Sequence, residues 1–305
     1  MKTDNISIII PVYNTADTLA RTLEAICNLD YPPENLFVIV VDDASVDHSV
    51  EIAESFRNRL SLQVLCQSIN NGAAAARNRG WRESDSDWIA FLDSDLKVDR
   101  FWLRRLKACF NQQSIRGVMG WVLPPPEWPE TRLQRYIYAR NRGAFPYQGQ
   151  PLKFKHFLFN NTLLRRELLE EFSGFDDNFT TYGEDTELAL RLWKRYPHGL
   201  YFCAEAVAWH YHARELEDFE RIMFEYGRVK IPRLLAKHPG FEEDLGLSRV
   251  RIQLSAFTGH LWFLGLLKLV CRIAPERFSS FWFRLLLGSW MLRGFREKKW
   301  VASNF

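Results

Sequence analysis

Short apolar runs alternate with amphipathic segments through the first 120 residues. The runs are compact and mostly β-branched or aliphatic, as expected of buried parallel strands. They span residues 6–10, 37–41, 62–65 and 88–92. The segments around them place apolar side chains at helical spacing. These segments span residues 17–29, 47–60, 73–82 and 100–110. The alternation predicts an α/β fold with a doubly wound, mostly parallel sheet flanked by helices.

A proline-rich break at 124–129 ends this half of the chain. Helical spacing returns afterwards, and a proline at position 232 interrupts the last of these helices. The predicted helices are residues 130–142, 184–195 and 216–237, and the predicted extended segments are 154–164 and 207–212.

Composition places the chain among globular proteins. Of its 305 residues 47% are apolar and 25% are charged, which excludes a disordered chain. Five scattered cysteines without a Cys-x-x-Cys pair predict reduced thiols. No opening segment has the pattern of a signal peptide, so we expect the N-terminal part to fold in the cytosol.

Charge and aromatic residues gather in the C-terminal region. Residues 249–305 hold ten Lys/Arg and two Asp/Glu, whereas residues 1–248 carry a net charge of −5. The basic region is also rich in Trp and Phe. That combination favours the cytoplasmic face of an anionic membrane over nucleic acid as a partner.

This region has two apolar segments, residues 252–270 and 278–292. A spanning helix needs ~20 apolar residues, so the first segment could just span a membrane and the second is short. Both contain charged residues, so we interpret them as helices that lie in or shallowly on the membrane surface, as in a peripheral or monotopic protein. Tail aromatics such as Trp262, Phe283 and Trp290 would supply the apolar contact. Packing of these helices on the rest of the chain, or between the copies of a homodimer, is the alternative.

Asp93 and Asp95 directly follow the predicted strand at 88–92. Carboxylates at positions i and i+2 leave a strand end in the same direction and repel each other. A divalent cation that bridges to a diphosphate would relieve this repulsion, and Mg²⁺ or Mn²⁺ prefers such oxygen ligands. A solvated turn that caps the next helix is the alternative, because Asp is common there.

Other polar clusters can likewise be interpreted either as functional or as purely structural. Asp42 and Asp43 follow a buried strand and could bind a base N–H or a ribose hydroxyl, or could simply form a turn. Glu184 and Asp185 begin a helix, whose dipole stabilises ionised carboxylates, so either could act as a general base or as a cap. His210 and His212 leave a strand two residues apart. They could bind a metal or be structural.

The order of these motifs is more specific than any one of them. It runs Ser7-Ile8-Ile9-Ile10-Pro11-Val12-Tyr13-Asn14, Val41-Asp42-Asp43-Ala44-Ser45, Asn70-x-Gly72-x-Ala74-Ala75-Ala76-Arg77-Asn78, Phe91-Leu92-Asp93-Ser94-Asp95, Gly174-Phe175-Asp176, Gly183-Glu184-Asp185 and Trp209-His210. Over roughly residues 6–237 this series resembles the family 2 glycosyltransferases of the GT-A fold.

The resemblance implies a role for individual residues. Asp185, with Glu184 beside it, would be the catalytic base of a direct displacement that inverts the anomeric carbon. A divalent cation, Mg²⁺ or Mn²⁺, would stabilise the leaving diphosphate as a Lewis acid. The implied metal ligands are Asp95, Asp93 and His210, with His212 as a substitute candidate. The implied contacts of the donor nucleotide are Pro11, Tyr13, Asn14, Asp43, Arg77, Asn78, Asp93 and Ser94.

The resemblance also implies a domain organisation. Residues 1–240 would form the catalytic domain, with a nucleotide-binding half at 1–120 and an acceptor-binding half at 121–240. Residues 241–305 would form the helical, membrane-associating region.

Two departures from the family patterns indicate how many sugars are added and which type of acceptor is used. The Gln-x-x-Arg-Trp signature of processive synthases does not occur, which favours the addition of a single sugar. Polyprenyl-phosphate enzymes usually lack a helix that starts like Glu184-Asp185, which favours a hydroxyl of a glycan or lipid-linked acceptor. The favoured donor is a nucleotide sugar of the UDP type. A polyprenyl-phosphate glycosyltransferase, a nucleotidyltransferase and a non-catalytic membrane-bound carbohydrate-binding module are the alternatives.

Overall fold

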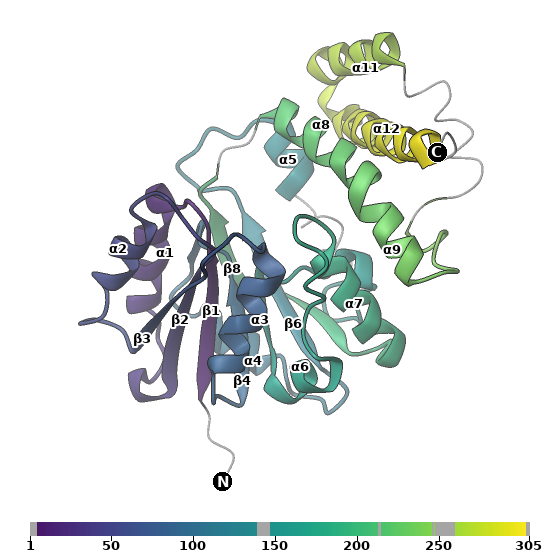
Figure 1. Ribbon diagram of the computed structural model, residues 1–305. Coiled ribbons are helices and arrows are strands. Elements are labelled where there is room, and N and C mark those ends of the chain that lie inside the picture. Colours follow the sequence, from purple (N-terminus) through teal and green to yellow (C-terminus); the bar gives the residue numbers. More distant parts are fainter. Residues whose placement is uncertain (1–4, 139–146, 213–214, 246, 248–259, 303–305) are drawn as a thin grey trace. The chain divides into compact units, whose positions relative to one another are not determined.

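The computed structural model describes residues 5–138, 147–212, 215–245, 247 and 260–302. The chain divides into two compact units (Figure 1). The first combines Met1–Trp128 with Tyr138–His212, and the second combines Pro129–Ile137 with Ala213–Phe305. The predicted functional boundary at residue 240 stays a prediction.

The first unit is a mixed α/β structure. Its strands are β1 Ile6–Val12, β2 Leu36–Asp42, β3 Leu62–Cys66, β4 Trp88–Leu92, β5 Leu96–Val98, β6 Gly117–Leu123, β7 Asn161–Arg165 and β8 Leu200–His210. Its α-helices are α1 Ala16–Cys27, α2 Ser49–Glu54, α3 Ala73–Glu83, α4 Trp102–Ala108, α6 Arg166–Phe172 and α7 Glu184–Arg195. Two short 3₁₀ turns, η1 Pro33–Asn35 and η4 Phe154–His156, complete it.

The strands form one eight-stranded sheet in the order β3-β2-β1-β4-β7-β6-β8-β5. The pairs β1–β2, β1–β4, β2–β3 and β6–β8 are parallel, whereas β7 runs antiparallel to β4 and β6, and β5 antiparallel to β8. The expected α/β sheet is therefore confirmed, with antiparallel strands in its second half.

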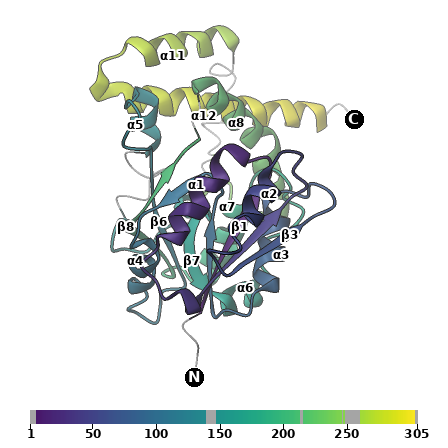
Figure 2. The same cartoon turned by 90° about the vertical axis from the view of Figure 1, so that its left-hand side faces the viewer.

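Helices cover both faces of this sheet. One core cluster joins α1, α2 and α4 to alternate residues of β1, β2 and β4. On the other face α3 packs so closely that a Cβ added at Gly80 would meet the side chains of Ile9 and Val41. Figure 2 shows α4 on one side of the strands, and α3 and α6 on the other. This three-layer packing directs the carboxyl ends of β1, β2 and β4 to one edge.

Most predicted elements of the first unit are present. β4 and α7 have the predicted bounds, but α2 ends at Glu54, so residues 55–60 are not helical. β5, β6 and α6 were not predicted. β5 has only three residues and β6 contains two glycines, so neither has a clear strand pattern.

The second unit is helical. Its elements are α8 Leu216–Glu225, the π-helical segment η5 Tyr226–Lys230, α9 Ile231–Lys237, α11 Leu261–Ile273 and α12 Glu276–Ala302, together with most of α5 Arg132–Tyr138. The predicted helix at 216–237 is confirmed, and its irregular turn lies just before Pro232. Residues 139–142 and 252–259 of the predicted helices lie outside the described residues.

Two glycines let α12 approach the α8–η5 helix closely. A Cβ added at Gly227 would fall on the Met291 carbonyl oxygen, and one at Gly294 on the Phe224 carbonyl oxygen. Phe283, Leu264 and Leu267 form a buried cluster nearby, and Trp282 and Trp290 pack against it. Among the described residues, no helix is both long and apolar enough to cross a membrane.

Candidate active site

Most of the predicted site residues lie at the carboxyl ends of β1, β2 and β4 or at the start of α7. This edge is where parallel α/β sheets bind ligands. Tyr13 and Asn14 follow β1, Asp43 follows β2, and Asp93 and Asp95 follow β4. The first unit therefore gathers side chains that are far apart in the sequence.

Asp43 organises the loop before α3. Its Oδ1 accepts hydrogen bonds from Gln67 Nε2 at 2.7 Å and from the Asn71 backbone N–H at 2.8 Å, and its Oδ2 accepts one from Gly72 N–H at 2.7 Å. The side chain is buried. Any contact with a nucleotide would thus use the remaining acceptor capacity of a carboxylate that already holds this loop.

Tyr13 and Asn14 lie on the surface after β1, where Asn14 contacts the loop that follows β2. The side chain of Asn14 accepts a hydrogen bond from the Val46 backbone N–H at 2.9 Å, which fixes a backbone turn with φ of 50°. Tyr13 is 49% exposed, so its ring is available to stack on a base. Pro11 is half-buried within β1, and Ser94 is buried, with its carbonyl accepting from Thr22 Oγ1 at 2.8 Å.

Arg77 is the centre of a carboxylate cluster. Its Nη2 lies 2.9 Å from Asp93 Oδ1, and its Nη1 lies 3.3 Å from Glu184 Oε1 and 3.2 Å from Asp185 Oδ1. The arginine side chain is only 4% exposed, and its guanidinium also lies over the ring of Phe175. Arg77 was predicted to line the nucleotide pocket. In the structure it ties the end of β4 to the start of α7.

The cluster is strongly anionic. Desolvation raises the pKa of Asp93, and the neighbouring charges of Asp95 and Asp185 raise it further, against the opposing effect of Arg77. Three carboxylates, those of Asp93, Glu184 and Asp185, share the charge of this one guanidinium, and the carboxylate of Asp95 lies beside His210. Because the excess is negative, the site favours the approach of a further cation.

Asn78 supports the cluster from behind. It is fully buried, and its Nδ2 donates to the Phe175 carbonyl at 2.8 Å and to Asp177 Oδ1 at 2.7 Å. Its Oδ1 accepts from the Phe175 backbone N–H and from Trp81 Nε1. Asn78 was also predicted to contact the nucleotide. With its amide used in this way, its contribution would be indirect, through the position of residues 175–177.

Asp95 and His210 meet at the ends of β4 and β8. His210 Nε2 lies 3.0 Å from Asp95 Oδ2, and its Nδ1 lies 2.9 Å from the hydroxyl of Tyr138. The ring of His212 is stacked beside that of His210, with centroids 6.0 Å apart. Of the two predicted histidines, His210 is therefore the one that contacts a predicted metal ligand.

The donor set suits a hard divalent cation that also binds a ligand. Asp95 offers carboxylate oxygen, and His210 can present the lone pair of Nε2 when Tyr138 accepts a hydrogen bond from Nδ1–H. Across the described part of the chain, no three His, Cys, Asp or Glu side chains form a group that could hold a metal by themselves. Mg²⁺ commonly takes one or two carboxylates and completes its shell with water and phosphate, which fits this incomplete set.

Two features of the site were not predicted from the sequence. Tyr138 was assigned only to a helix, and nothing in its sequence context indicates the contact with His210. Gly72 has φ of 86°, and an added Cβ would fall on the carbonyl oxygen of Thr180. The loop before α7 thus lies directly against the loop that Asp43 holds.

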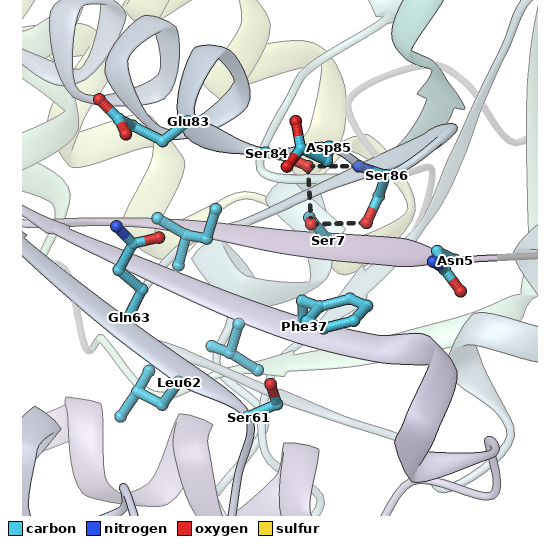
Figure 3. A pocket seen from close by; sticks show the side chains of 12 residues that line it. Asn5, Ser7, Phe37, Ser61, Leu62, Gln63, Glu83, Ser84, Asp85 and Ser86 are labelled. Carbon is cyan, nitrogen blue, oxygen red and sulfur yellow. Dashed lines mark hydrogen bonds between the residues drawn. The ribbon is translucent and has the colours of Figure 1, made fainter. Parts of the chain in front are cut away.

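A pocket of about 350 Å³ lies at the opposite, amino ends of the first three strands (Figure 3). Within it the hydroxyls of Ser7, Ser84 and Ser86 are linked by hydrogen bonds of 2.8 and 2.9 Å. The serine hydroxyls thus have one another as hydrogen-bond partners. No predicted site residue lines the pocket. We assign it no part in the site.

Known proteins resemble this chain in sequence. The probable glycosyltransferase YdaM of Bacillus subtilis is 29% identical over 214 residues, covering 67% of this chain and 50% of that protein. The minor teichoic acid biosynthesis protein GgaA of the same organism is 42% identical over 188 residues, covering 56% of this chain and 40% of that protein. The chain thus spans half or less of the length of these relatives.

Solved structures share the fold. A mannosyltransferase of Pyrobaculum calidifontis, in complex with GDP-Man and Mn²⁺, matches this chain with a TM-score of 0.65 at 18% identity. The match covers 99% of this chain and 90% of the mannosyltransferase chain. TarS of Staphylococcus aureus, in complex with UDP-GlcNAc, has a TM-score of 0.59 at 16% identity, with 98% and 92% covered. Residues 7–173, more than half of the chain, match glycosyl transferase family 2. The chain therefore belongs to glycosyl transferase family 2.

Proposed function

We propose that this protein transfers a single sugar from a nucleotide-sugar donor, with a UDP-sugar favoured, to a hydroxyl of a glycan or lipid-linked acceptor. The observation that carries the proposal is the cluster of Asp93, Glu184 and Asp185 around Arg77 at the carboxyl edge of the sheet. A relative bound to UDP-GlcNAc and another bound to GDP-Man support a nucleotide-sugar donor.

Asp185 is the proposed general base. It lies in the first turn of α7, where the helix dipole stabilises its ionised form, and its side chain is 19% exposed. Its carboxylate would accept the proton of the acceptor hydroxyl as that oxygen attacks the anomeric carbon. The nucleotide diphosphate leaves from the opposite side, so the configuration inverts.

Arg77 would position this base. It holds Asp185 and Glu184 next to Asp93, and the three carboxylates stay partly exposed. One guanidinium is shared among these three carboxylates.

Asp95 and His210 would hold a divalent cation, Mg²⁺ or Mn²⁺. When bound, it would stabilise negative charge on the leaving diphosphate. Asp43 and Tyr13 would hold the nucleotide, the first through its remaining acceptor capacity and the second by stacking.

Asp185→Asn tests the proposal. The amide keeps the shape of the side chain but cannot take the proton, so transfer should fall roughly 10²- to 10⁴-fold while donor affinity changes little. The measurement is turnover with a panel of nucleotide sugars and acceptors, together with calorimetry for donor binding.

Glu184→Gln is the matched control, since Glu184 contacts the same arginine and belongs to the same helical turn. It should reduce transfer far less than Asp185→Asn. Near wild-type turnover of Asp185→Asn would show that Asp185 is not the base. The anomeric configuration of the product, read by NMR, tests the inversion independently.

A further inference from the structure

Helix α11 in the second unit is apolar on two opposite sides. Its inner side, Leu264, Leu267 and Cys271, is buried against α12 and its neighbours. Its outer side carries Trp262, Leu266, Leu269 and Ile273, which are 66%, 50%, 51% and 70% exposed. The spacing of four, three and four residues places these side chains on one face of the helix. We call these four residues the outer stripe.

Few of the exposed side chains of α11 are polar. Its exposed residues are Leu261, Trp262, Gly265, Leu266, Leu269, Arg272 and Ile273, of which only the arginine is charged. A surface helix of a soluble unit normally carries polar side chains on this face. A contiguous apolar face of this kind marks a surface that binds another molecule or a membrane.

The charge of α11 and α12 indicates which kind of surface binds this face. Residues 260–302 contain eight Lys/Arg and two Asp/Glu. Lys268 contacts Glu217 at 2.6 Å and Glu220 at 3.1 Å, whereas Arg272 and Arg284 are exposed. A second copy that packs through the same stripe would place no negative charge opposite Arg272, because no exposed residue of α11 is acidic. An anionic phospholipid surface supplies both the apolar layer and the complementary charge.

We propose that the outer stripe of α11 docks on an anionic phospholipid surface, with the helix axis lying in the plane of the membrane. Trp262 and the aliphatic residues enter the boundary between headgroups and acyl chains, and Arg272 at the edge of the face contacts headgroup phosphates.

The stripe differs from the contact expected from the sequence. Of the tail aromatics, Trp262 stays in the docking surface, but Phe283 is 3% exposed, and Trp290 packs against the same buried cluster. These two side chains stabilise the second unit. The contact with lipid falls instead to the aliphatic residues Leu266, Leu269 and Ile273.

Co-sedimentation with vesicles tests the proposal. The full chain is mixed with vesicles of phosphatidylcholine alone, or of phosphatidylcholine with about one third phosphatidylglycerol. The stripe variant, Trp262→Ser with Leu266→Ser and Leu269→Ser, replaces side chains that are 66%, 50% and 51% exposed. The control variant, Val46→Ser with Ile69→Ser, removes apolar side chains that are 90% and 64% exposed in the first unit.

We expect the wild type and the control to bind the anionic vesicles, and the stripe variant to bind at least roughly tenfold more weakly. Arg272→Glu should weaken binding to anionic vesicles, and added salt should do the same. Circular dichroism confirms that each variant is folded.

Two results would overturn the proposal. One is equal vesicle binding by the wild type and the stripe variant. The other is a wild type that binds neither vesicle but forms a dimer that the stripe variant breaks, which would assign the face to a second copy. Neither result depends on sugar transfer, so the proposed function is tested separately.

Discussion

Arg77→Met should destabilise the first unit through the three carboxylates that it leaves behind. Removing one partner of a fully buried ion pair costs about 3–5 kcal/mol. Here the side chains of Asp93, Glu184 and Asp185 are 35%, 14% and 19% exposed, so water can partly replace the guanidinium. We therefore expect a loss of about 2–3 kcal/mol in the free energy of unfolding at pH 7.

The loss should depend on pH. Burial already raises the pKa of Asp93, and Arg77 opposes this rise, so the substitution moves the pKa of Asp93 further up in the folded state. A carboxyl group whose pKa is raised by folding contributes stability at low pH and loses it as the pH rises through the folded-state pKa. The deficit of Arg77→Met is thus largest at neutral pH and shrinks toward pH 5.

Urea unfolding at pH 7 and pH 5 in EDTA, followed by tryptophan fluorescence, measures both effects. Arg57→Met is the control, because Arg57 pairs with Glu54 at the surface, where water screens the interaction and the pair contributes little to stability. Arg77→Lys should recover part of the loss, since it keeps the charge but not the forked geometry. A deficit below about 1 kcal/mol, or one that is equal at both pH values, would refute the reasoning.

Two further predictions concern the loops around the site. Gly72→Ala should cost roughly 2 kcal/mol of unfolding free energy, because the residue has φ of 86° and its Cβ would fall on a backbone carbonyl; unaltered urea unfolding would contradict the close loop contact. EDTA and Asp95→Ala should each abolish metal-dependent donor binding in calorimetry, with a smaller effect for His210→Ala and a still smaller one for His212→Ala. Full donor affinity of Asp95→Ala, or a larger loss with His212→Ala, would contradict the assigned ligands.

Much of the fold could be predicted because its signals are local. The buried strands β1, β2 and β4 are continuous apolar runs, and α7 begins with acidic residues and continues with helical apolar spacing. β5 and β6 could not be predicted in this way. Their pairing with β8 links residues about a hundred positions apart, and their own sequences are short or glycine-containing.

The sequence indicated which residues belong to the candidate site better than it indicated which of them contact one another. The order of motifs indicated that Asp93, Asp185 and His210 belong to one site, but the hydrogen-bond partners of the site residues are visible only in the structure. Arg77 donates hydrogen bonds to carboxylates, and the side-chain amide of Asn78 donates hydrogen bonds to Phe175 and Asp177. The sequence does not indicate these hydrogen-bond partners, because the partners of Arg77 lie as many as 108 residues away along the chain.

The sequence by itself determined which residues could form strands, which chemistry they carry at the strand ends, and the basic, aromatic character of the tail. These properties follow from residue type and spacing along the chain. Only the tertiary structure decided that one guanidinium is shared by three carboxylates, that Tyr138 meets His210, and that Phe283 is buried while Trp262 is exposed. The reason is physical: burial and pairing depend on which distant segments pack together, and helical spacing on α11 leaves two apolar sides of which packing covers only one.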